Sequence, residues 1–427
     1  MQDTKHLLNR IGFGPRLGDV QRIQEIGPEK YLEQQLHPDR IDDNVCDSSL
    51  LNLASIRMST PELIRRYQPP RRARQLQARG RDPQMRPMTV EVPQQLLQDL
   101  QGQKLIRAVH SQRQLQEVMT DFWFNHFNVF WNKNADRWLT TNYEKEAIRP
   151  HVLGKFKDLL MATAKNPAML FYLDNHLSSS IKGINENYGR ELMELHTLGV
   201  DGGYTQKDVQ EVARAFTGWS IERPQVSGDF IFRARIHDNG EKNVLGHKIH
   251  GGGIHDGETV IDILAKHPST ARFISTKLVR RFVSDDPPDE LVQHVAEVYR
   301  KTDGDIREMM RTIVSSKEFN SPDAIGAKTK TPFEYVASAI RSLNGTTDGS
   351  RMLAQSVARM GQPLYQCQPP AGYPDEGSHW MSDSAVLERL NFAVALTANR
   401  IPGTSVSFDD PTKSVVAKLG SPEFQKR

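Results

Sequence analysis

The stretch that decides the fold runs from residue 114 to residue 130 and reads QLQEVMTDFWFNHFNVF. At the 100° spacing of an α-helix, its large apolar side chains gather on one arc: Leu115, Val118, Met119, Phe122, Trp123, Val129 and Phe130. Glu117, Asp121 and Asn128 lie on the opposite face. The stretch therefore predicts a helix that turns its apolar arc toward the core.

A histidine, His126, falls in the middle of this apolar arc. A buried neutral histidine needs a hydrogen-bond partner for at least one ring nitrogen. One interpretation is a structural histidine bonded to a carbonyl or carboxylate, and the other is a metal ligand or general base.

A second helical stretch, residues 185–198, holds a carboxylate in its apolar arc. Glu191 lies inside that arc, with Glu194 on one flank and His196 on the other. A carboxylate there needs an ion pair, a hydrogen bond or a metal. One interpretation is that Glu191 forms a buried ion pair with an arginine. The others are functional: Glu191 is a metal ligand, a general acid or base, or an anchor for a polar substrate. We expect Glu191 and His126 to be buried in one polar pocket, since isolated buried polar groups are costly.

Helical periodicity covers most of the chain, but residues 230–236 alternate at period two. The turn-forming triplet Asp-Asn-Gly follows at 238–240, and residues 244–249 can return as a second strand. The sequence thus predicts a mainly α fold, a large multi-helical domain with a small β-hairpin insertion near 230–249. We expect an N-terminal helical segment (1–64), an Arg/Pro-rich loop (65–90), a helical core domain (91–320) and a C-terminal helical region packed on the core (321–427).

The segment bounded by Arg65 and Arg86 contains eight arginines and one acid. Such a basic stretch with few apolar residues cannot pack a core, so it predicts an exposed loop. It is either a solvated insertion or a contact for an anionic ligand such as nucleic acid or an acidic glycan. Only one aromatic residue, Tyr67, lies among the arginines, so base stacking has little support and there is no clear nucleic-acid motif.

Composition excludes several classes of protein. The 427 residues are 37% hydrophobic and carry a net charge of +3, which suits a globular protein without a strong overall field. The sequence has no apolar run of ~18 residues, so it predicts no integral membrane segment. As written, the chain is cytoplasmic, and it is exported if a leader was removed. Walker A, Rossmann and His-Glu-x-x-His motifs are all lacking, which disfavours nucleotide, NAD and zincin chemistry.

Further candidate ligands for a divalent metal follow the period-two segment. His237 and Asp238 end the expected strand, where side-chain geometry can be fixed, and both residue types bind zinc-like or manganese-like ions. We therefore place His237 and Asp238 with His196 as candidate metal ligands. Asp208, by contrast, completes a Thr-x-x-Asp capping box with Thr205, so we expect a helix cap there rather than a ligand.

Several blocks carry a family resemblance: HLLNR with GFGP near the N-terminus, FWFNHF at 122–127, NENYGRELMELHTLG at 185–199 and PAGYP at 370–374. The sequence resembles the bacterial family known as domain of unknown function 1800 over roughly residues 6–398. The resemblance implies a protein that is often exported and whose gene often sits beside that of a sulfatase-like protein. In the C-terminal block we take Tyr373 and Trp380 as candidate substrate-binding residues.

Two functions follow from these residues. The first is an enzyme with a buried Glu/His site, in which His126, Glu191 and Glu194 are catalytic and perform metal-assisted hydrolysis or oxidation. The alternative is a non-catalytic binding or assembly protein that acts with its sulfatase-like neighbour on a surface polymer.

Overall fold

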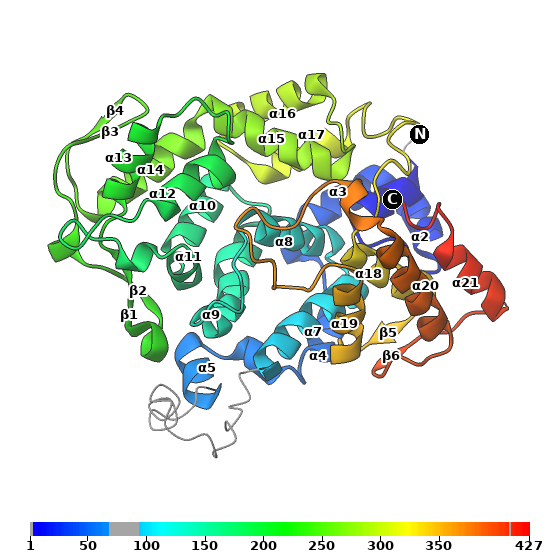
Figure 1. Ribbon diagram of the computed structural model, residues 1–427. Coiled ribbons are helices and arrows are strands. Elements are labelled where there is room, and N and C mark those ends of the chain that lie inside the picture. The colour runs from blue at the N-terminus through cyan, green and yellow to red at the C-terminus, as the bar shows by residue number, and fades with distance from the viewer. Residues whose placement is uncertain (1–2, 68–93, 410) are drawn as a thin grey trace, which may run out of the picture.

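The computed structural model describes residues 3–67, 94–409 and 411–427, and over them the protein is mainly helical. The only regular strands in these residues form two-stranded antiparallel sheets. Helices α10–α17 and strands β1–β4 make up one side of the molecule, helices α1–α3 and α18–α21 the other, and α7–α9 lie between them (Figure 1). The mainly α class with small hairpins is thus confirmed.

The α-helices of the first half are α1 (Thr4–Arg10), α2 (Asp19–Ile26), α3 (Pro28–Gln35), α4 (Asn44–Ser49), α5 (Thr60–Tyr67), α7 (Gln94–His110), α8 (Gln114–His126), α9 (Asp136–Asn142), α10 (Phe156–Lys165), α11 (Pro167–Tyr172) and α12 (Asn187–Glu191). Those of the second half are α13 (Gln206–Ala215), α14 (Ile254–Lys266), α15 (Pro268–Phe282), α16 (Asp289–Lys301), α17 (Ile306–Val314), α18 (Pro332–Ser342), α19 (Arg351–Arg359), α20 (Asp383–Thr397) and α21 (Thr412–Gly420).

The strands pair locally and differently from the expected hairpin. They are β1 (Trp219–Glu222), β2 (Asp229–Phe232), β3 (Lys242–Val244), β4 (His247–Ile249), β5 (Thr346–Thr347) and β6 (Thr404–Ser405). Of the alternating segment only residues 230–232 belong to β2, because Ala234–Ile236 is a 3-10 turn, so His237 and Asp238 follow a turn rather than end a strand. Strand β2 pairs with β1 rather than with residues 244–249, and β3 pairs with β4. The β3–β4 turn at Leu245 and Gly246 has positive φ at both positions, 51° and 82°, which suits a two-residue hairpin. This local turn is why residues 244–249 do not pair with β2.

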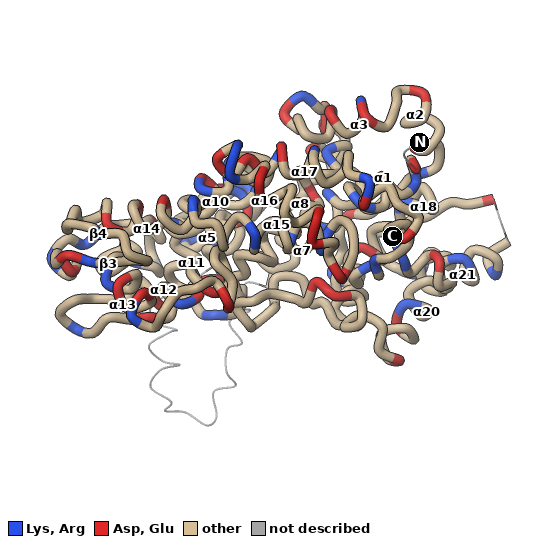
Figure 2. Tube along the Cα trace, turned by 90° about the horizontal axis from the view of Figure 1, so that it is seen from above, with Lys and Arg blue, Asp and Glu red and all other residues tan. Residues whose placement is uncertain are grey.

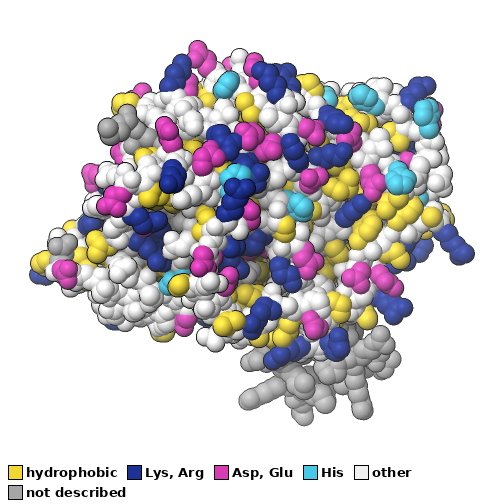
Figure 3. Space-filling view, turned by 180° about the vertical axis from the view of Figure 1, so that it is seen from behind, with side chains coloured by type: hydrophobic (Ala, Val, Ile, Leu, Met, Phe, Trp, Pro, Cys, Tyr) yellow, Lys and Arg dark blue, Asp and Glu magenta, His cyan; other side chains and the backbone are white. Residues whose placement is uncertain are grey.

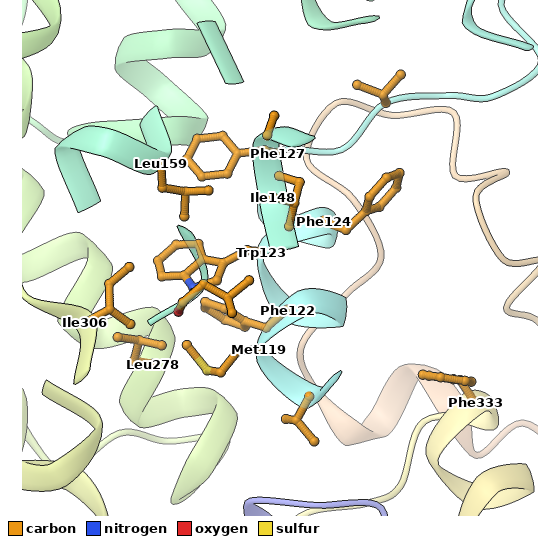
Figure 4. Packing of buried hydrophobic residues seen from close by; sticks show 14 of the residues in the cluster. Met119, Phe122, Trp123, Phe124, Phe127, Ile148, Leu159, Leu278, Ile306 and Phe333 are labelled. Carbon is orange, nitrogen blue, oxygen red and sulfur yellow. The ribbon is translucent and has the colours of Figure 1, made fainter. Parts of the chain in front are cut away.

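The hydrophobic core is one large cluster with a small satellite around Cys46. It includes residues from α1 to α21, such as Leu7, Trp123 and Leu419, each with no exposed side-chain surface. At its centre the apolar face of α8 packs against α15 and α17, where Trp123 lies near Leu278 and Ile306 (Figure 4). The core is continuous from the first helix to the last, and the expected division of the chain into four parts stays a prediction.

Two sequence expectations concern the outer surface. Helix α5 continues to Tyr67, so Arg65 and Arg66 are helical rather than loop residues, and most of the arginine-rich segment lies outside the described residues. Charges of both signs alternate along the chain and over the back of the molecule (Figures 2 and 3). Among the described residues, every helix is too short or too polar to cross a bilayer.

Candidate functional site

A cavity lies where the segment between α19 and α20 crosses α8. We call this segment, residues 360–382, the strap, and Figure 1 shows it passing over α8 in orange. The cavity is lined by the strap, by Lys104 of α7, by Arg281 of α15 and by the face of α8 that carries Asp121 and Asn125. Its volume of about 50 Å³ has room for a few water molecules or one small functional group.

Two asparagines fasten the strap to α8. The Asn125 amide donates to the carbonyl of Tyr373 (2.9 Å) and accepts from its backbone N–H (2.8 Å). Asn128 donates to the carbonyls of Cys367 (2.9 Å) and Pro369 (2.8 Å). Gly372, at φ 76°, lies so close to Asn125 that a side chain would collide with its backbone. The strap is therefore held in place by Asn125 and Asn128, which themselves line the cavity.

Buried ion pairs make up the charged part of the wall. Lys104 Nζ lies 2.8 Å from Asp121 Oδ1, and both side chains are largely buried. Arg281 Nη1 lies 2.6 Å from Glu334 Oε1 at the start of α18. Burial raises the pKa of Glu334, but Arg281 and Arg427 outweigh that effect and hold it at about 2. Glu334 is thus ionised and Arg281 stays charged.

Three donors at this wall lack acceptors. Arg281 uses Nη1 for Glu334, while its Nε and Nη2 are buried with no partner among the described residues. The Trp380 Nε1–H of the strap is likewise buried and unpaired. The Nε and Nη2 hydrogens of a guanidinium are parallel, which is the geometry that binds both oxygens of a carboxylate. Unpaired buried donors are rare and indicate a missing acceptor.

The expected substrate-binding residues both line this cavity. The rings of Tyr373 and Trp380 lie 5.9 Å apart, and the Tyr373 hydroxyl donates to the carbonyl of Pro363 (2.7 Å). Cys367 lines the cavity too, and burial raises the pKa of its thiol to about 11. A thiol that stays protonated is a poor nucleophile, so Cys367 serves packing rather than chemistry.

The two helix histidines lie in the core on the other side of α8. His126 Nε2–H donates to the carbonyl of His196 (3.1 Å), and the two rings lie 6.1 Å apart. Burial, with nearby Lys277, lowers the pKa of His196 to about 3 and that of His126 well below its usual value. Both are therefore neutral near pH 7, and His126 fits the structural interpretation of a histidine bonded to a carbonyl.

Glu191 is half-buried, which is less than the large burial that we expect from the sequence, and it is not hydrogen-bonded to His126. The reason is a π-helical turn, Leu192–Thr197, that follows α12. It is closed by i,i+5 bonds, such as Leu198 N–H to the Met193 carbonyl (2.8 Å). The wider turn breaks the 100° spacing on which the predicted arc rests. Burial and then the neighbouring Glu194 raise the pKa of Glu191, and the Tyr204 hydroxyl donates to Glu194 at 3.4 Å.

The remaining candidate metal ligands bond to protein groups. His237 Nδ1 lies 2.7 Å from the Thr217 carbonyl, and its Nε2 lies 3.0 Å from Asp256, which also pairs with buried Lys242 at 2.7 Å. Asp238 forms a two-point ion pair with Arg214. Within the described ranges, three or more His, Cys, Asp or Glu side chains are nowhere arranged to hold a metal ion. The structure thus brings none of the predicted metal ligands together.

Comparison with known proteins identifies the family. The model of the family described as "Protein of unknown function (DUF1800)" matches residues 6–426, nearly the whole chain. The protein belongs to the DUF1800 family. No curated protein and no solved structure matches this DUF1800 chain. The resemblance drawn from the sequence blocks is thereby confirmed.

Sequence reasoning did not select Lys104, Asp121, Asn125 or Arg281 of the cavity. The usable signal was the polar face of the 114–130 stretch. Glu117 and Asn128 on it are buried, 6% and 3% exposed. Buried polar side chains need partners: Glu117 of α8 pairs with Arg149 (2.7 Å), Asp121 pairs with Lys104 of α7, and Asn128, just beyond the end of α8, bonds the strap.

Proposed function

We propose that this DUF1800 protein is a non-catalytic binding protein that receives a carboxylate in the cavity beneath the strap. The observation that carries the proposal is the unused pair of parallel N–H groups on charged, buried Arg281 beside the unpaired Trp380 N–H. A carboxylate is the ligand that satisfies such a pair with two charge-assisted hydrogen bonds.

The composition of the cavity supports binding rather than catalysis. Asp121 and Asp375 of the lining, and Glu334 that pairs with Arg281, are each paired with a cation, so none is a free general base. The small volume suits the terminal group of a ligand whose remainder lies outside, past Pro374 at the exposed edge of the strap. An acidic sugar of a surface polymer has this form. In that role the sulfatase-like neighbour is the candidate partner, and the arginines of residues 65–86 are candidate contacts for the same acidic ligand.

The test uses two sugars that differ only at one carbon. Galacturonate carries a carboxylate where galactose carries a hydroxymethyl group, so we expect galacturonate, but not galactose, to raise the melting temperature of the full chain. Replacing Trp380 with Phe removes the N–H and keeps the ring, and should weaken galacturonate binding about fivefold or more.

The matched control for this variant is Trp138→Phe, because Trp138 Nε1 is also buried and unpaired but lies in α9, away from the cavity lining. We expect that control to bind galacturonate like the wild type. Equal responses to the two sugars, or equal weakening in both tryptophan variants, would refute the proposal.

A second candidate function rests on Glu191. Its raised pKa beside Glu194 is the pattern of a carboxyl acid/base pair, which keeps the enzyme hypothesis with Glu191 as the general acid and Glu194 as its partner. A polymer-cleaving activity that Glu191→Gln abolishes, with galacturonate binding retained, would favour this second function over the first.

A further inference from the structure

A groove separate from the cavity lies between α7 and α19. On α7 its wall is formed by Gln94, Gln98 and Gln101, spaced i, i+4 and i+7, which places them on one helix face. On α19 Arg351, Gln355 and Ala358 repeat the same spacing. The two helices are adjacent in Figure 1, and the groove volume of about 380 Å³ is within the range of ligand sites.

The wall is rich in solvent-accessible amides that bond no other group of the described protein. The side-chain amides of Gln94, Gln98, Gln355 and Gln366 make no hydrogen bond within the described part of the chain, whereas that of Gln101 donates to the carbonyl of Leu364 (3.1 Å). Trp131 at the end of the groove has a buried N–H without an acceptor. An amide both donates and accepts, as a hydroxyl does. A row of free amides therefore matches a row of hydroxyl groups.

The groove also carries positive charge without a counter-charge. Arg351 is exposed, and neither it nor Arg137 pairs with a carboxylate among the described residues. No Asp or Glu is among the described lining residues. Arg137 instead donates to Asn132 (3.0 Å) and lies over the ring of Trp131. A ligand with occasional negative groups suits two such cations.

We propose that this groove binds an acidic polysaccharide, with the amides bonding its hydroxyls and the two arginines its carboxylates. Nucleic acid fits less well, because its phosphates are bound by many cations and its bases stack on exposed aromatic faces. Here amides outnumber arginines, and Trp131 is 5% exposed. The groove does not depend on the cavity. Gln366 faces the groove, whereas its neighbours Tyr365 and Cys367 line the cavity, so the strap is the wall between them.

The experiment is calorimetric titration of the full chain with three probes: hexagalacturonate, its methyl-ester form without charge, and a single-stranded oligonucleotide. We expect hexagalacturonate to bind best and to weaken as salt rises from 50 to about 300 mM. The variants Arg351→Ala and Gln98→Ala should each weaken that binding about fivefold, and the pair together more.

Two further variants separate this site from others. Arg300→Ala removes an equally exposed, unpaired arginine from α16, on the far side of the molecule in Figure 1, and should change nothing. Trp380→Phe should leave the groove contribution intact even where it abolishes galacturonate binding in the cavity. Tighter binding of the oligonucleotide, equal binding of the esterified hexamer, or full affinity in the Arg351 and Gln98 variants would each overturn the proposal.

Discussion

At the scale of single residues, the pKa of a buried carboxyl group depends on the charges of its neighbours. Glu334, 4% exposed, lies between Arg281 and Arg427, whereas half-buried Glu191 is affected more by the carboxylate of Glu194 than by Arg190. Their pKa values consequently move in opposite directions, and so must the effects of pH on their contributions to stability.

Glu334→Gln removes the charge and keeps the helix cap with Thr331, since glutamine can serve in a capping box. We expect it to lower the free energy of unfolding at pH 7 by about 3–5 kcal/mol, because two buried arginines lose their counter-charge. The pKa of Glu334 is about 2 in the folded state against an ordinary 4.5, so its stabilisation is present above pH 4.5 and is lost as pH falls toward 2.

Urea titrations at several pH values check this prediction. The control is Glu388→Gln, which removes a partly exposed partner of Arg359 and should change the free energy of unfolding by less than about 1 kcal/mol. An equal loss in both variants would contradict the buried-pair account.

Glu191→Gln should change the free energy of unfolding in the opposite direction to Glu334→Gln. Burial and Glu194 raise the pKa of Glu191, so the folded protein holds this proton more tightly than the unfolded chain, and the carboxylate destabilises it once pH exceeds the raised value. We expect the variant to be more stable than the wild type at pH 7.5, by less than about 1 kcal/mol because the side chain is partly solvated. The difference should vanish at pH 4. A lower melting temperature at pH 7.5 would instead reveal a bonded, structural carboxylate.

At the scale of elements, a few hydrogen bonds fix the path of segments whose own sequence favours no helix or strand. The strap contains no α-helix or strand along its length, and Asn125 and Asn128 set its path by bonding its backbone. Asp208 does the same for the β3–β4 turn, because its Oδ1 accepts from Leu245 N–H (2.8 Å) while its Oδ2 bonds Thr205.

Asn125→Ala should loosen the strap without unfolding α8. Two hydrogen bonds to Tyr373 are lost, which corresponds to about 1–3 kcal/mol. Hydrogen exchange of the Tyr373 amide should quicken by at least about tenfold, and galacturonate binding should weaken with it. Asn391→Ala, at an exposed position of α20, is the control. Unchanged exchange at Tyr373 would show that other contacts hold the strap.

Asp208→Ala tests the capping box that the sequence predicts and the structure confirms. A lost cap lowers the free energy of unfolding by about 0.5–2 kcal/mol. We expect the upper part of that range, since the turn at Leu245 loses an acceptor as well. Metal content measured before and after the change should be the same, and loss of a bound metal would show that Asp208 is a ligand.

At the scale of the whole molecule, contacts between distant parts of the chain close the structure. His6 bonds the carbonyl of Phe319 (2.9 Å), and Arg341 donates to the carbonyl of Gly14 (2.8 Å). Because one apolar cluster extends from α1 to α21, we expect the full chain to unfold in a single calorimetric transition whose measured and van't Hoff enthalpies agree. A fragment of residues 321–427 should lack stable helix by circular dichroism. Two resolved transitions would support separate domains.

The sequence by itself determined the local features of this protein. Apolar periodicity predicted the helical class and α8, although the helix ends at His126 rather than at Phe130. The Thr205–Asp208 box predicted the start of α13, and characteristic blocks predicted the family. These features depend on residues within a few positions of one another, so they can be read along the chain.

The tertiary structure alone decided which polar residues meet. Lys104, Asp121, Arg281 and Glu334 come from four helices, and no periodicity within one helix predicts which side chain of another will face it. The π-helical turn after Glu191 likewise departs from the 100° spacing on which the prediction rests, whereas β1 and β2 pair locally as a hairpin that the alternation of residues 230–236 alone does not reveal. Helical spacing correctly predicted that His126 is buried. It could not predict that α8 is buried on both faces, because the strap that covers the second face lies about 250 residues further along the chain.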